Sequence, residues 1–183
     1  MRRALLSSVA IAALSTFGDF VWATWIPRHT MALGIGHGAI LFAAVGLALG
    51  IQAGRPLRGA VGTAVIGAAA AVSYYVMAPG LGFTAMFVAW FGIWIALAAM
   101  TSRLHRWPAA WRVVTTRGVA AAVGSGLAFY VISGIWRPFD PVGWDYAVHF
   151  AAWTAAYFPG FAALIGRRPT TKNSKNTNPR QCR

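Results

Sequence analysis

Six long apolar runs dominate this 183-residue chain, each bounded by charge, proline or glycine. They cover residues 4–26, 31–52, 57–78, 83–101, 118–136 and 146–166. A helix needs about 20 apolar residues to cross a bilayer, where every backbone polar group must be hydrogen-bonded internally. The runs are continuous and lack the alternation of barrel strands. The sequence therefore predicts an all-α integral membrane protein, a bundle of six transmembrane helices.

Composition excludes a soluble globule. Hydrophobic residues make up 58% of the chain and charged residues 10%, whereas soluble proteins carry about 25% charged residues. The net charge of +13 comes from basic residues that flank the apolar runs rather than forming one face. We therefore expect no nucleic-acid partner and assign the charge to membrane topology.

The basic residues also predict the orientation. Of the 16 Lys and Arg residues, all except Arg28 and Arg137 fall at connections or termini that six spans would place on one side. The positive-inside rule puts that side, with both termini, in the cytoplasm. The first run begins like a signal peptide at Arg2 and Arg3, but it is long enough to span and lacks a clear A-x-A site, so we expect a retained helix. The Arg-rich, Ala- and Gly-rich composition suggests a bacterial inner membrane.

Residues 1–168 form the expected membrane domain, and residues 169–183 are predicted to be a disordered, basic cytoplasmic tail. Between the fourth and fifth spans, residues 102–116 mix arginine with tryptophan and leucine. They fit either an interfacial segment on anionic headgroups or an aromatic-anchored loop, and Pro108 argues against one uninterrupted helix. Pro159 and Gly160 predict a kink in the sixth span.

Small residues mark one ridge of the second span. Gly34, Gly38, Gly46 and Gly50 recur at multiples of four, which aligns them on one side of a helix. Such a ridge allows another backbone to approach closely. It predicts either packing inside the bundle, or an interface with a second copy or a membrane-protein partner, or a groove for a flat lipid.

Three ionisable residues fall within the spans, where they are costly: Asp19, His37 and His149. With the orientation above, each lies roughly 5 to 10 Å below the outer interface. Because a tight turn joins the first two spans, we expect those helices to be neighbours and Asp19 to pair with His37. The aromatic residues expected around this cluster are Trp22, Tyr74, Tyr75, Tyr130 and Trp153.

Four interpretations of the cluster remain open. It is a hydrogen-bonded tie between helices, a ligand pocket open to the outer leaflet, a metal or haem site, or part of a proton-coupled transporter. No His pair occurs at i,i+4, and no ionisable group marks a route through the midplane. The chain has no hydrolase, ATPase or dehydrogenase motif, and a single cysteine, Cys182. We expect no catalytic residue, metal or cofactor.

Short motifs in the chain resemble the insulin-induced gene (Insig) family of six-span membrane proteins. The similar stretches are 25–27 (Trp-Ile-Pro) with the Gly-rich 34–50, then 92–94 (Gly-Ile-Trp), and 131–136 (Val-Ile-Ser-Gly-Ile-Trp) with Asp140 and Tyr146. The resemblance implies a non-enzymatic protein with a lipid-accessible cavity for a neutral lipid and a membrane-protein partner. The function expected from the sequence is binding of a small apolar ligand beside the cluster. The alternatives are a His- and Asp-dependent metal or haem oxidoreductase and a structural subunit of a membrane complex.

Overall fold

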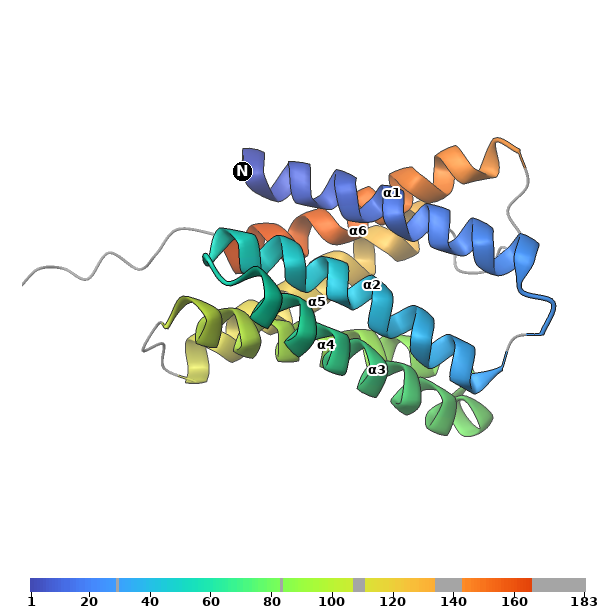
Figure 1. The fold of residues 1–183 in the computed structure, drawn as a ribbon, viewed down its shortest axis with the longest axis horizontal. Helices are drawn as coiled ribbons and strands as arrows, with labels where there is room; N and C mark the ends of the chain where they lie inside the picture. Colours follow the sequence, from blue (N-terminus) through green and yellow to red (C-terminus); the bar gives the residue numbers. More distant parts are fainter. Residues whose placement is uncertain (29, 83, 107–110, 134–142, 166–183) are drawn as a thin grey trace, which may run out of the picture.

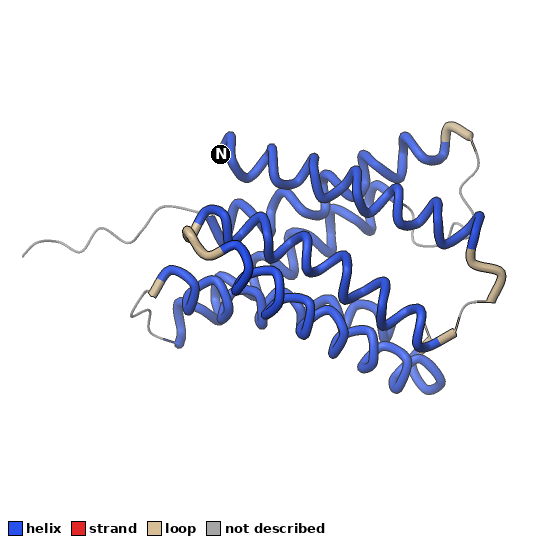
Figure 2. The backbone as a smooth tube through the Cα atoms, viewed as in Figure 1, coloured by secondary structure: helices blue, strands red, loops and turns tan. Residues whose placement is uncertain are grey.

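The computed structural model describes residues 1–28, 30–82, 84–106, 111–133 and 143–165. Within these residues every regular element is an α-helix, as Figure 2 shows. The helices are α1 (Arg2–Trp25), α2 (Met31–Gln52), α3 (Pro56–Leu81), α4 (Thr84–His105), α5 (Trp111–Ser133) and α6 (Asp145–Ile165). The all-α prediction is confirmed, and the predicted second span coincides with α2.

Five of the six helices, namely α1 to α4 and α6, are long and apolar enough to cross a membrane. The remaining helix, α5, does not reach the same apolarity over a full span. It begins seven residues before the predicted run and carries Arg112 and Arg117 in its first two turns. Five apolar helices make this an integral membrane protein, because soluble folds do not contain several runs of this length and apolarity.

Successive helices run antiparallel, so alternate connections gather at the same end of the bundle (Figure 1). The N-terminus, the α2–α3 turn and the end of α6 lie together at one end. The most extensive contacts join α2 to α3, α5 to α6 and α1 to α6. Contacts between α1 and α2 are few, so the expectation that chain neighbours pack as close partners is wrong for this pair. The partner of α1 is α6.

The glycine ridge of α2 packs against α3 in the same chain. A side chain on Gly46 would overlap Thr63 and Gly59, and one on Gly38 would meet Gly67. The Thr63 hydroxyl donates to the carbonyl oxygen of Phe42 at 2.6 Å, so the close approach also forms an interhelical hydrogen bond. The ridge therefore serves packing inside the bundle, which is one of the alternatives the sequence left open.

The other face of α3 is apolar and exposed. Leu57, Val61, Val65 and Val76 are 74%, 58%, 65% and 70% exposed, and they lie on the side of the helix away from its Gly59 face. A water-soluble protein rarely leaves such a contiguous apolar stripe uncovered. Hydrocarbon is the environment that suits this face.

The α2–α3 turn shows how the chain reverses at a short connection. Gly54 has φ +68°, a left-handed conformation that glycine adopts without a steric penalty. The Arg55 N–H then donates to the Gly50 carbonyl oxygen at 2.7 Å, as in a Schellman C-cap, and Pro56 starts α3 at its first position. Three residues are enough to return the chain antiparallel.

Helices extend further than hydropathy predicts. The gap at 79–82 between the third and fourth predicted runs is not a turn throughout, because α3 continues through Pro79 to Leu81 and Gly82 is its C-cap. The segment 102–116 is divided between the end of α4 and the start of α5, so its two ends are helical. Pro108 and the tail 169–183 lie outside the described residues. Helix α6 is continuous through Pro159.

Candidate functional site

Asp19 on α1 is hydrogen-bonded to two side chains of α6. Its Oδ2 accepts from His149 Nε2 and from Trp153 Nε1, each at 2.8 Å. His149 and Trp153 are four residues apart, so they project from the same face of α6 and reach one oxygen. Because a carboxylate only accepts hydrogen bonds, His149 presents a protonated Nε2 toward it. One carboxylate oxygen therefore holds two donors from the neighbouring helix.

His37 on α2 faces the other oxygen of the same carboxylate. Its Nε2 lies 3.9 Å from Asp19 Oδ1, which is too long for a hydrogen bond. The ring also lies 5.5 Å, centroid to centroid, from Trp22. Gly18 makes this approach possible, because a Cβ there would lie 3.0 Å from His37 Cε1. The three ionisable residues do meet, and the hydrogen-bonded partner of Asp19 is His149 rather than the expected His37.

An aromatic and hydroxyl seam continues this contact deeper between α1 and α6. The Trp153 ring stacks on Tyr157 with centroids 5.4 Å apart. Tyr157 is fully buried, and its hydroxyl lies 3.1 Å from Ser15 Oγ. Ser15 donates its own hydrogen to the Ile11 carbonyl oxygen, so Tyr157 is the donor between the two hydroxyls.

The sequence interpretation overlooked Ser15 and Tyr157, although their spacing signals them. Ser15 precedes Asp19 by four residues, and Tyr157 follows Trp153 by four, so each pair shares a helix face. Polar residues at that spacing on two apolar helices predict a common seam.

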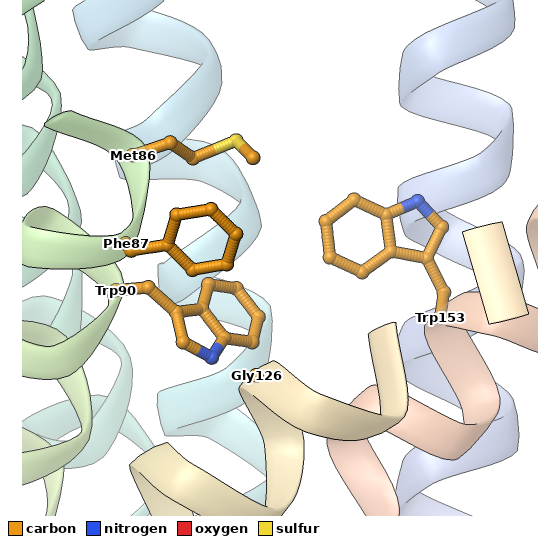
Figure 3. Close-up of a pocket in the computed structure, with 5 residues that line it drawn as sticks. All are labelled: Met86, Phe87, Trp90, Gly126 and Trp153. Carbon is orange, nitrogen blue, oxygen red and sulfur yellow. The ribbon is translucent and has the colours of Figure 1, made fainter. Parts of the chain in front are cut away.

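On the other side of Trp153 lies a small cavity between α4, α5 and α6. Figure 3 shows Phe87 and Trp90 on one wall and Trp153 on the opposite wall, with Gly126 below. Met86 completes a lining that encloses about 30 Å³, roughly the space of one water molecule. The buried indole nitrogen of Trp90 has no hydrogen-bond partner among the described residues. Otherwise this cavity is an apolar, aromatic-walled space.

A larger groove of about 380 Å³ lies between α1 and α2. Its walls are apolar apart from His37 and the indole of Trp22, and its rims include Phe17 and Ile40, which are 58% and 69% exposed. In the described part of the chain, no arginine or lysine lines it. Since these rims lie on the outer surface of apolar helices, the groove opens sideways. The lining residues are Leu14, Phe17, Gly18, Val21, Trp22, Ile26, Ala32, Leu33, Gly36, His37, Ile40 and Leu41.

The predicted site residues therefore fall into three groups. Trp22 and His37 line the groove, while Asp19, His149 and Trp153 form the hydrogen-bonded group next to it. Tyr75 lies against Gly34 and stacks edge-on with Tyr74, and neither tyrosine lines the groove. The side chain of Tyr130 lies outside the described residues. Across the described part of the chain, no three His, Cys, Asp or Glu side chains are grouped so as to hold a metal ion.

No protein-family model, curated protein or solved structure matches this chain.

Proposed function

We propose that this protein binds a neutral lipid or another small apolar ligand in the α1–α2 groove, without catalysing a reaction. The observation that carries the proposal is the combination of an apolar lateral groove with a histidine in its wall, His37, whose Nε2 makes no hydrogen bond among the described residues. A groove of about 380 Å³ falls within the size range of small-molecule sites, which are mostly apolar with a few polar groups that fix orientation. His37 is such a group.

The groove suits a ligand that arrives from the bilayer. Phe17 and Ile40 stand at exposed positions on its rims, so a ligand would enter sideways without crossing water. Among the described residues no arginine or lysine lines the walls to pair with a phosphate, and the Asp19 carboxylate lies 3.9 Å from His37 Nε2. An anionic headgroup would meet like charge there, which favours a neutral ligand.

In this proposal all six helices span the membrane and both termini are cytoplasmic. The antiparallel order supports this orientation, because Arg3, Arg55, Arg58 and Arg103 then lie at one end of the bundle. We further propose a bacterial inner-membrane location and kinship with the Insig family. The second of these rests on the short motifs alone. A membrane-protein partner or a second copy would use a surface other than the α2 ridge, which α3 covers.

Filling the groove tests the proposal. Gly36 lines the groove, and a Cβ built on it meets nothing within 4 Å, so Gly36→Leu would occupy ligand space without disturbing the bundle. Gly92 on α4 is similarly open and provides the matched control Gly92→Leu. Lipid extracted from each purified variant would be quantified by mass spectrometry. We expect a co-purifying neutral lipid that falls at least roughly fivefold in Gly36→Leu and stays at the parental level in Gly92→Leu.

Equal lipid content in both variants would reject the groove as the binding site. A protein that carries no stoichiometric lipid would instead favour a purely structural role for the Asp19 contacts. Because Gly36 is remote from the α2–α3 interface, thermal stability of both variants provides the check that the fold is intact.

A further inference from the structure

His37 in the groove wall and Asp19 next to it each have a polar atom without a hydrogen-bond partner among the described residues, and these two atoms face each other. Asp19 Oδ2 is occupied by His149 and Trp153, whereas Asp19 Oδ1 has no hydrogen bond among the described residues. His37 Nε2 likewise has none there, and it lies 3.9 Å from Oδ1. Asp19 and His37 are partly exposed, at 26% and 32% of their side chains, so both atoms belong to groups that a ligand can reach.

The 3.9 Å separation fits one bridging oxygen. An oxygen atom about 2.8 Å from Asp19 Oδ1 and about 2.9 Å from His37 Nε2 completes a triangle with normal hydrogen-bond lengths. The Asp19 carboxylate can only accept, and His37 donates toward it in the tautomer that carries its proton on Nε2, the tautomer that this proposal assumes. The bridging group must therefore donate to one side and accept from the other, which is what a hydroxyl does.

We propose that Asp19 and His37 together recognise a hydroxyl group of the ligand, so that the groove selects a neutral, hydroxyl-bearing lipid. This inference rests on the proposed function and adds the ligand's polar group to it. An ether or ester oxygen accepts from His37 but cannot donate to Asp19, so it leaves the carboxylate oxygen unpaired. That loss is costly in an apolar groove.

Three probes of equal chain length test this recognition. They are a hexadecan-1-ol with a photoreactive diazirine in mid-chain, its methyl ether, and the corresponding primary amine. Each is incorporated into phosphatidylcholine vesicles that contain the purified protein, and cross-linked peptides are mapped and quantified by mass spectrometry. Labelling of the exposed α3 stripe, such as Val61 and Val65, reports contact with bulk lipid.

We expect the alcohol to label α1 and α2 groove residues roughly three- to tenfold more than the methyl ether does, because one hydrogen bond is lost. Equal labelling of the groove by both would overturn the hydroxyl inference and leave the proposed function standing. Labelling of the groove no higher than of the α3 stripe by every probe would overturn the proposed function itself. Stronger labelling by the amine would also overturn the inference, since it indicates a cationic ligand.

Two variants test whether Asp19 and His37 cause the preference for the alcohol. In Asp19→Asn, the amide oxygen replaces Oδ2 as acceptor for His149 and Trp153, so the amide nitrogen faces the ligand. An N–H donates to an alcohol and to an ether alike. We therefore expect the ratio of groove labelling by the alcohol to labelling by the methyl ether to fall to about one. In His37→Gln the side-chain amide retains a donor, and part of the preference should remain. Leu47→Ala, on α2 but outside the groove, is the control and should label as the parent does. A preference unchanged in Asp19→Asn would refute the bridge.

Discussion

The hydrogen bond between Trp153 and Asp19 should make a measurable energetic contribution to the α1–α6 contact. Truncating Asp19→Ala removes the carboxylate that accepts from two N–H donors, and Trp153→Phe removes one donor while keeping an aromatic ring on Tyr157. Each single change also alters packing. A double-mutant cycle cancels those terms and isolates the coupling between the two side chains.

The expected coupling follows from charge and environment. Hydrogen bonds between membrane helices contribute about 0.6 kcal/mol on average and about 1.7 kcal/mol at most. The Asp19–Trp153 bond is 2.8 Å long and involves a carboxylate, and such charge-assisted bonds are roughly twice as strong as neutral ones. Because Asp19 is partly exposed, solvent weakens this bond, and we place it in the upper middle of the range for membrane helices rather than above it. We expect a coupling of about 1 to 1.5 kcal/mol.

Reversible unfolding in mixed detergent micelles, followed by circular dichroism, would provide the four free energies of unfolding. The matched control is the cycle of Asp19→Ala with Trp111→Phe. Trp111 is 66% exposed at the opposite end of the bundle, so the two changes should be additive within about 0.5 kcal/mol. If the Asp19–Trp153 coupling is no larger than that of the control, the hydrogen bond contributes nothing beyond packing and the reasoning is wrong.

Three further predictions follow from the packing and topology. Gly46→Ala should destabilise the protein by about 1 to 3 kcal/mol because its methyl group overlaps Thr63 and Gly59, whereas Gly36→Ala should not, and thermal unfolding of both variants checks this. Tyr157→Phe should cost about 0.5 to 1.5 kcal/mol because it removes the donor to Ser15, and Ser15→Ala should add little more in the double variant; chemical unfolding measures both. With cytoplasmic termini, Cys182, the single cysteine, should react with a membrane-impermeant maleimide in inverted vesicles and not in intact spheroplasts; the reverse pattern would contradict the orientation.

The existence of the helices could be predicted from the sequence because run length alone is a sufficient signal in a bilayer. Their ends could not, because hydropathy marks where lipid contact stops rather than where hydrogen bonding stops. Helix α5 thus begins at Trp111, among basic residues, and α3 continues past Pro79 to Leu81. Outside the bilayer a polar or basic turn remains helical as long as its backbone is hydrogen-bonded.

The neighbours of each helix were also beyond simple inspection of the sequence. In a membrane helix the side that faces lipid and the side that faces protein are both apolar. The periodicity of hydrophobic residues therefore says little about which side contacts a partner. Chain proximity predicted α1 beside α2, yet α1 packs on α6, more than 120 residues away. The deciding contacts are a few polar side chains, and the shared depth of Asp19 and His149 was the sequence feature that indicated them.

The helix-tying and ligand-binding interpretations of Asp19 are compatible because its two oxygens have different surroundings. His149 and Trp153 hold Oδ2 and thereby fix the carboxylate against α6. Oδ1 is then aimed at His37 before any ligand arrives, so little ordering remains to be done on binding. The same hydrogen bonds that stabilise the bundle would preorganise the site. It follows that Trp153→Phe, although it does not touch the groove, should weaken the preference for an alcohol over its methyl ether. An unchanged preference in that variant would show that the two roles are independent.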